Sequence, residues 1–162
     1  IISRRFKFVR RGYSFRLTEF EGALGCAQLE IADKILSGRR ANAGYLINKL
    51  DCLKECLQLP WHPKYCEHAF MLFPIVIKKN AGFKKAYAVN YLEKHGIETR
   101  EMFPLISQPF YQKIFKIKKG DYPVADWINS NGFYIGCHQK MKKIELDYIV
   151  KTFFNFFKAH NK

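Results

Sequence analysis

A polar turn followed by a capped helix, near the start of the chain, is the feature that most constrains the fold. The segment Arg11–Thr18 leads directly into an apolar pattern with helical spacing. Thr18 and Glu21 have the spacing of a capping box, which predicts that a helix begins just after Thr18. The N-terminus of a helix offers backbone N–H groups and a favourable dipole to an anion. The turn that carries Ser14 and Arg16 is therefore a candidate phosphate site.

Long helical patterns follow this turn. Apolar residues recur at helical spacing from Phe20 to Ile35, and an apolar stripe continues from Ala43 to Leu57. The dipeptide Ser37-Gly38 lies between the two stretches, and we expect it to interrupt or bend the helix. The first helix is narrow because several of its residues are small, so another backbone could approach it closely: Gly22, Ala23, Cys26 and Ala27.

The remainder of the chain alternates strand and helix patterns, which predicts an α+β fold. Pro74 falls inside the first apolar run, which implies an edge position or a bulge there. Gly96 marks the end of the helix that follows. The expected elements are strands over 69–77, 97–103 and 133–136, and helices over 83–95, 123–129 and 142–158.

The charge balance narrows the classes of partner. Lys and Arg total 28 against 14 acidic residues, a net charge of +14. Such a chain can attract nucleic acids, membrane surfaces or small anions. No nucleic-acid-binding motif accompanies the charge, so that class is the least favoured. No apolar run approaches the roughly 18 residues of a membrane span, and the first residues do not resemble a signal peptide. We expect a cytoplasmic protein and, because Ile1 is not methionine, a start inside a longer reading frame.

The cysteines and histidines do not predict a metal site. Five cysteines are present, and Cys52 and Cys56 lie four residues apart with no second ligand pair. Reduced core cysteines in a cytosolic protein are the favoured interpretation. Four histidines show no spacing typical of a metal site or a catalytic triad: His62, His68, His95 and His160.

Four blocks of the sequence, in this order, resemble the C-terminal portion of a known family. They are Gly12–Leu29, Arg39–Leu46, His95–Tyr111 and Asp121–Ile149, the last containing Gly132-Phe133-Tyr134-Ile135-Gly136-Cys137-His138. The family is the DegT/StrS-type family, which comprises fold-type I pyridoxal-phosphate enzymes that act on nucleotide-linked keto sugars. The resemblance implies that residues 1–60 form a connecting arm and long helices, and that 61–162 form the C-terminal small α+β domain.

The resemblance also implies a function. In such enzymes an amino group passes from an amino acid, commonly glutamate, to a keto sugar used in surface-polysaccharide or related biosynthesis. A lysine that holds pyridoxal phosphate lies upstream of the Gly-Tyr turn in the family. We therefore expect no catalytic residue on this chain and no activity from the 162-residue segment alone. The family resemblance further implies a homodimer with a shared active site.

Individual residues receive roles through the same resemblance. Ser14 stands where the family usually has asparagine, and with Arg16 it is expected to contact the cofactor phosphate. The alternatives are a turn residue for Ser14 and a structural salt bridge for Arg16. Arg100, Ser107 and His138 are the expected substrate contacts, although Arg100 and His138 also suit structural roles at strand ends.

Other functions stay open. Many relatives carry a histidine shortly before the Gln108-Pro109 pair, where this chain has Ile106 and Ser107. That difference indicates another substrate or reaction. Sugar dehydratases of the same family use a base other than lysine. A non-catalytic binding or assembly module is a further alternative, and a basic nucleic-acid binder is the last.

Overall fold

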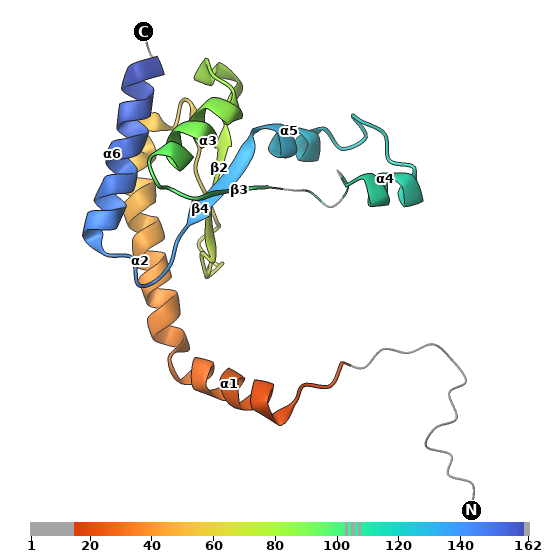
Figure 1. The fold of residues 1–162 in the computed structure, drawn as a ribbon, viewed down its shortest axis with the longest axis vertical. Coiled ribbons are helices and arrows are strands. Elements are labelled where there is room, and N and C mark those ends of the chain that lie inside the picture. The colour runs from red at the N-terminus through yellow and green to blue at the C-terminus, as the bar shows by residue number, and fades with distance from the viewer. Residues whose placement is uncertain (1–14, 103, 105, 107, 161–162) are drawn as a thin grey trace, which may run out of the picture. The chain divides into compact units, whose positions relative to one another are not determined.

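The computed structural model describes residues 15–102, 104, 106 and 108–160 (Figure 1). None of the helices among them is long and apolar enough to cross a membrane. The chain divides into two compact units between Asp33 and Lys34. The elements in chain order are α1 (Glu19–Glu30), α2 (Ala32–Leu50), η2 (Asp51–Leu53), β1 (Leu57–Gln58), β2 (Leu72–Ile77), η3 (Lys79–Ala81), α3 (Lys85–Lys94), β3 (Thr99–Glu101), α4 (Pro109–Phe115), α5 (Pro123–Asn131), β4 (Gly132–Gly136) and α6 (Lys143–His160).

Helix α1 begins where the sequence predicts. The Thr18 hydroxyl accepts a hydrogen bond from the backbone N–H of Glu21, and the Glu21 carboxylate accepts one from the Thr18 N–H, which completes the capping box. The helix ends at Ile31, whose N–H reaches the carbonyls of Gln28 and Leu29. No residue of α1 is buried.

The expected interruption at Ser37-Gly38 is wrong, because α2 runs through both residues. The hydroxyl of Ser37 donates to the Lys34 carbonyl at 3.2 Å and is thereby satisfied within the helix. Gly38 serves a close approach instead: a Cβ at this position would lie 2.9 Å from the Cβ of Gln139. The helical stretch is interrupted at Ile31 instead, six residues before the expected position.

The second unit is built on a four-stranded antiparallel sheet in the order β1-β2-β4-β3. β2 and β4 form its centre, with Leu72 opposite Gly136 and Val76 opposite Gly132. The chain passes through α3 between β2 and β3, so β4 inserts between two strands that precede it in sequence. This arrangement confirms the α+β class.

Pro74 lies in β2, an inner strand of the sheet, rather than in the expected edge strand. β1 is only two residues long and pairs with Val76 and Ile77. On the other side of β2, Pro74 lies opposite Tyr134 of β4. Within the described residues no strand pairs with Pro74 on the β1 side, so a residue without an N–H is tolerated there.

The core lies between the sheet and three helices, α2, α3 and α6 (Figure 1). Alternate residues of β2, Phe73, Ile75 and Ile77, point into this layer and are almost fully buried. Phe133 and Ile135 of β4 do the same. The opposite face of the sheet carries Pro74 and Val76 and is contacted by α5.

The predicted second-half elements are present with shifted ends. The final helix runs from Lys143 to His160 rather than over 142–158, and the second strand shrinks from 97–103 to Thr99–Glu101. β1 and α4 were not predicted. Because Leu46 and Leu50 of α2 belong to the same core as β2 and α6, α2 folds with the residues after it. The division at residue 60 stays a prediction.

Candidate functional site

The N-terminal turn is described only from Phe15 onward. Ser14 lies outside the described residues. Arg16 is exposed, three residues before α1. Thr18 and Glu21 already satisfy each other at the start of the helix. The hydrogen bonds that Glu21 accepts from Thr18 lower the pKa of its carboxyl, which favours the charged form.

This capping box changes the prediction for a phosphate. A carboxylate sits at the start of α1, so an anion approaching the helix N-terminus would meet a negative charge. The positive group of the described turn is the guanidinium of Arg16. Within the described turn, the guanidinium of Arg16 rather than the start of the helix is therefore the group suited to an anion.

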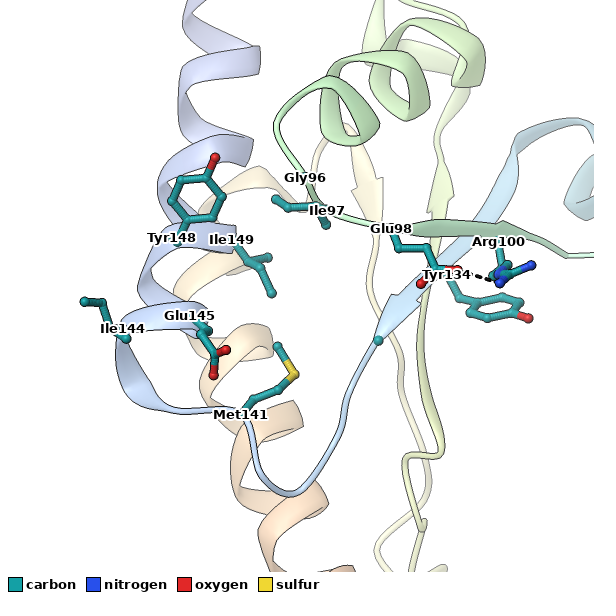
Figure 2. A pocket seen from close by; sticks show the side chains of 11 residues that line it. Gly96, Ile97, Glu98, Arg100, Tyr134, Met141, Ile144, Glu145, Tyr148 and Ile149 are labelled. Atoms are coloured by element: carbon teal, nitrogen blue, oxygen red, sulfur yellow. Dashed lines mark ion pairs between the residues drawn. The ribbon is translucent and has the colours of Figure 1, made fainter.

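A cavity with a volume of about 770 Å³ lies in the second unit (Figure 2). It extends between the loop after α3, the strands β3 and β4, and the first turns of α6. Its lining combines apolar, aromatic and charged groups: Gly96, Ile97, Glu98, Arg100, Tyr134, Gly136, Met141, Ile144, Glu145, Tyr148 and Ile149.

One wall of this cavity depends on how α3 ends. Gly96 has a φ of +73°, a left-handed conformation that glycine adopts without strain. The N–H of Ile97 then returns to the Leu92 carbonyl at 3.0 Å. From α6, the hydroxyl of Tyr148 donates to the His95 carbonyl at 2.8 Å. The loop is thus held at both sides.

Arg100 is the predicted substrate contact that the structure places in this cavity. It lies on β3 opposite Tyr134 of β4, and Figure 2 shows the two side chains close together. Its guanidinium forms an ion pair with Glu98 at 2.5 Å, and two thirds of its side chain is exposed. An anionic ligand would therefore compete with Glu98 for this arginine.

His138 stands apart from the cavity lining. It follows β4 and is exposed. Its Nδ1 accepts a hydrogen bond from the Lys140 N–H at 3.1 Å, and its carbonyl accepts one from the Asn42 amide at 2.7 Å. These bonds fix the turn between β4 and α6. Ser107 lies outside the described residues, so Arg100 is the single predicted site residue found at the cavity.

The sequence did not single out the other polar groups of the cavity. Tyr134 comes from β4 and lies beside Arg100, whereas Tyr148 comes from α6 and lines the other side of the cavity (Figure 2). A correct prediction of the pairing between β3 and β4 would have identified Tyr134, because Arg100 and Tyr134 lie opposite each other in the two strands. No comparable signal exists for Tyr148.

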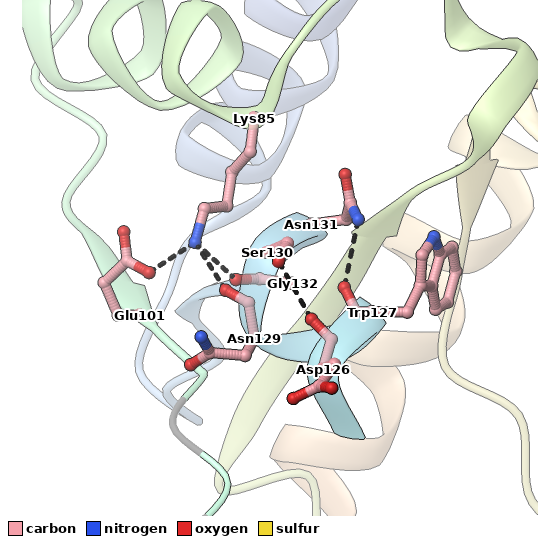
Figure 3. Close-up of polar contacts among 8 residues, drawn as sticks. All are labelled: Lys85, Glu101, Asp126, Trp127, Asn129, Ser130, Asn131 and Gly132. Carbon is pink, nitrogen blue, oxygen red and sulfur yellow. Dashed lines mark hydrogen bonds and ion pairs between the residues drawn. The ribbon is translucent and has the colours of Figure 1, made fainter. Parts of the chain in front are cut away.

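A second polar cluster fixes the strand that carries Arg100 (Figure 3). The ammonium of Lys85, at the start of α3, forms an ion pair with Glu101. It also donates to the carbonyls of Asn129 at 3.1 Å and Gly132 at 3.4 Å. Within α5, Ser130 and Asn131 donate to the carbonyls of Asp126 and Trp127. The cluster joins α3, β3 and the end of α5.

The described residues contain no group of three or more His, Cys, Asp and Glu side chains that could hold a metal ion. They do contain exposed arginines suited to a phosphate. Of the residues predicted to meet a cofactor phosphate, Arg16 fits chemically, because a guanidinium binds a phosphate in a bidentate manner.

Comparison with known proteins identifies what this arrangement resembles. The model of the DegT/DnrJ/EryC1/StrS aminotransferase family matches residues 2–154. The lipopolysaccharide biosynthesis protein RfbH of Salmonella typhimurium is 30% identical over 155 residues, which is 94% of this chain and 36% of RfbH. The GDP-4-keto-6-deoxy-D-mannose 3-dehydratase of Escherichia coli O55:H7 is 33% identical over 150 residues, covering 89% and 37%.

A solved structure of such a 3-dehydratase also resembles this chain in fold. The E. coli GDP-4-keto-6-deoxy-D-mannose-3-dehydratase with bound hydrated PLP superimposes with a TM-score of 0.78 at 29% identity. The alignment covers 91% of this chain and 38% of that chain. The chain therefore spans a little over a third of the length of the relatives it matches.

Proposed function

This chain belongs to the DegT/DnrJ/EryC1/StrS aminotransferase family, and from that premise we propose that it is the C-terminal part of an enzyme that acts on a nucleotide-linked keto sugar with pyridoxal phosphate. The observation that carries the proposal is the family match over residues 2–154. The relatives whose names state an activity act on nucleotide-linked sugars, which are GDP-linked in the 3-dehydratases of E. coli O55:H7 and Yersinia pseudotuberculosis and dTDP-linked in that of Saccharopolyspora spinosa. The net charge of +14 supports it, because such sugars and the cofactor are anionic.

The cofactor would supply an electron-withdrawing ring that stabilises negative charge on a neighbouring carbon. This chain would contribute the guanidinium of Arg16 to the phosphate, across a dimer interface, with Ser14 beside it. The lysine that binds the cofactor is expected upstream. We therefore propose that the segment alone forms no covalent cofactor adduct and has no activity.

The substrate would meet the second unit at Arg100, with Ser107 and His138 as further contacts. Arg100 is suited to an anionic group because it is exposed and lines a cavity large enough for a small molecule. Tyr134, its partner across the ladder, adds a hydroxyl and an aromatic face. The ion pair with Glu98 keeps the guanidinium oriented until the ligand arrives.

Two reactions fit this enzyme class. Amination of the keto sugar, with an amino acid such as glutamate as donor, is the reaction that the sequence predicts. Dehydration is the second candidate, and the identities favour it: 33% to a 3-dehydratase against 24% to the GDP-perosamine synthase of Caulobacter vibrioides. The two reactions leave different products, an amino sugar in the first case and a sugar that has lost water in the second.

The test uses the full-length protein loaded with pyridoxal phosphate and supplied with L-glutamate and GDP-4-keto-6-deoxymannose. Mass spectrometry of the product distinguishes amination from loss of water. Arg16→Gln is expected to weaken cofactor binding about tenfold, because a charged hydrogen bond contributes about 1.5 kcal/mol or more. Lys34→Gln, which removes another exposed cation, should leave cofactor binding unchanged. A full-length protein that binds no pyridoxal phosphate would support a non-catalytic module instead.

A further inference from the structure

A smaller cavity with aromatic walls lies on the face of the sheet that is turned away from the core. Its volume is about 300 Å³, at the lower end of the range for small-molecule sites. Pro74 and Val76 of β2 line it, so it opens on the face opposite the Phe73 core. Trp61 lines it while 83% of that residue remains exposed. An exposed indole beside a cavity is a ready surface for stacking.

Three further aromatic rings form one wall. The imidazoles of His62 and His68 are stacked with their centroids 6.1 Å apart. The ring of Phe70 meets both edge-on, at 4.4 Å from His68 and 5.6 Å from His62. Phe70 is buried and has a φ of +46°, a rare conformation for a bulky residue. Such local strain is typical of functional sites.

Hydrogen bonds fix which nitrogen of each imidazole carries the proton in the neutral form. The Nδ1 of His68 accepts from the Phe70 N–H at 3.0 Å, so its Nε2 carries the hydrogen and can donate. The Nδ1 of His62 lies 3.2 Å from the Pro63 carbonyl and must donate to it, so its Nε2 can accept. Neither Nε2 has a hydrogen-bond partner among the described residues. The wall thus offers one donor and one acceptor.

Cations lie beside the same wall. A neighbouring cavity of about 400 Å³ shares His62, His68 and Phe70 with the cavity beside Trp61. Arg40 and Lys64 also line this neighbouring cavity. Arg40 forms an ion pair with Glu67 at 3.0 Å. Lys64 is exposed and has no ion pair within the described part of the chain. An aromatic wall with a donor, an acceptor and adjacent cations matches a ligand that joins a planar heterocycle to a phosphate.

We propose that the cavity formed by Trp61, His62, His68 and Phe70 binds the nucleobase of the nucleotide-linked substrate. The base stacks on Trp61, and its polar edge pairs with the two free imidazole nitrogens. This assignment rests on the proposed function, since it names the site for one part of that substrate. A nucleobase meets both requirements of the wall, because it has a flat aromatic face and an edge of alternating donors and acceptors.

The test uses tryptophan fluorescence, because the chain has two tryptophans, Trp61 and Trp127. Trp127→Phe leaves Trp61 as the single reporter, and Trp61→Phe leaves Trp127. We expect GMP to quench the first variant and not the second. Ribose 5-phosphate, which lacks the base, should quench neither. By calorimetry, Trp61→Ala should raise the Kd for GMP about tenfold, as stacking on an aromatic side chain predicts, while circular dichroism confirms that the variant is folded.

Three results would overturn the proposal: no binding of GMP to the unmodified chain, equal binding by the Trp61→Ala variant, or equal quenching by ribose 5-phosphate. These outcomes are separable from failure of the proposed function. If the full-length protein converts the keto sugar but Trp61→Ala leaves its KM unchanged, the function holds and the nucleobase site is wrong. If GMP binds through Trp61 but no sugar is converted, the site stands and the proposed reaction fails.

Discussion

Lys85, the first residue of α3, forms an ion pair with Glu101, the last residue of β3. Only 14% of the Lys85 side chain is exposed, and its ammonium also reaches two carbonyls at the end of α5. One charged group thereby connects three elements that are separated in the sequence. The strand that it fixes also carries Arg100.

Lys85→Met is expected to lower the free energy of unfolding by about 2 kcal/mol, because it leaves a carboxylate and two carbonyls without their donor. Urea denaturation measures the change. Lys84→Met is the matched control: Lys84 is exposed and its side chain caps nothing, so its effect should stay within about 0.5 kcal/mol. Equal effects of the two variants would contradict a role for the ammonium contacts.

Gly132→Ala should destabilise the chain through a steric clash at the start of β4. An added Cβ would lie 2.6 Å from the Ile128 carbonyl oxygen and 3.1 Å from the sulfur of Met102. We expect a loss of about 1–3 kcal/mol and a lower Tm in thermal unfolding. Gly136→Ala, at the other end of the same strand, meets nothing within 4 Å and should leave the Tm nearly unchanged.

Cys137 should resist alkylation in the folded chain. Burial raises the pKa of its thiol from 9.0 to about 11, against a smaller opposing effect of Arg39. Iodoacetamide at pH 8 should label the exposed Cys26 and Cys52, and label Cys137 only after unfolding. The unfolded state loses this proton first, so stability should fall as the pH rises from 9 to 11. Equal labelling of Cys137 and Cys52 in the folded chain would refute the prediction.

Tyr45→Phe should raise the pKa of Asp147. The Tyr45 hydroxyl donates to the Asp147 carboxylate, and this bond, followed by that of Lys143, lowers the pKa of the carboxyl below 3.8. The charged aspartate therefore favours folding above about pH 4, and this contribution is lost as the pH falls through the folded-state pKa. NMR titration of Asp147 measures the shift. Tyr148→Phe, which removes a hydroxyl bound to the His95 carbonyl, should not change it.

Local signals predicted the fold best. The Thr18–Glu21 capping box and the left-handed Gly96 act within a few residues, and both are present. Features decided by packing were missed. The sequence predicted that Gly38 interrupts a helix, yet Gly38 lies within α2 and allows Gln139 to approach the helix closely. β1 has two residues, too few to leave a periodic pattern, and exists because β2 provides its partner.

The candidate site likewise contains residues that the sequence indicated and residues that only the fold brings together. The resemblance pointed to Arg100, which does line a cavity. Nothing in the sequence separates Lys85 from Lys84, because only the packing of α3 decides which ammonium faces Glu101. His62 and His68 show no recognisable spacing, and the loop between β1 and β2 brings their rings together. Groups that meet through tertiary structure leave no mark on sequence spacing.

Pro74 also has a consequence for the behaviour of the chain in concentrated solution. The two residues of β1 leave part of β2 without a neighbouring strand on that side, within the described part of the chain. An open length of apolar strand invites a foreign chain to extend the sheet and begin aggregation. Pro74 lies in this open length and lacks the N–H that such a ladder needs. Pro74, which is unfavourable in most central strands, thus hinders the addition of a foreign strand to this sheet.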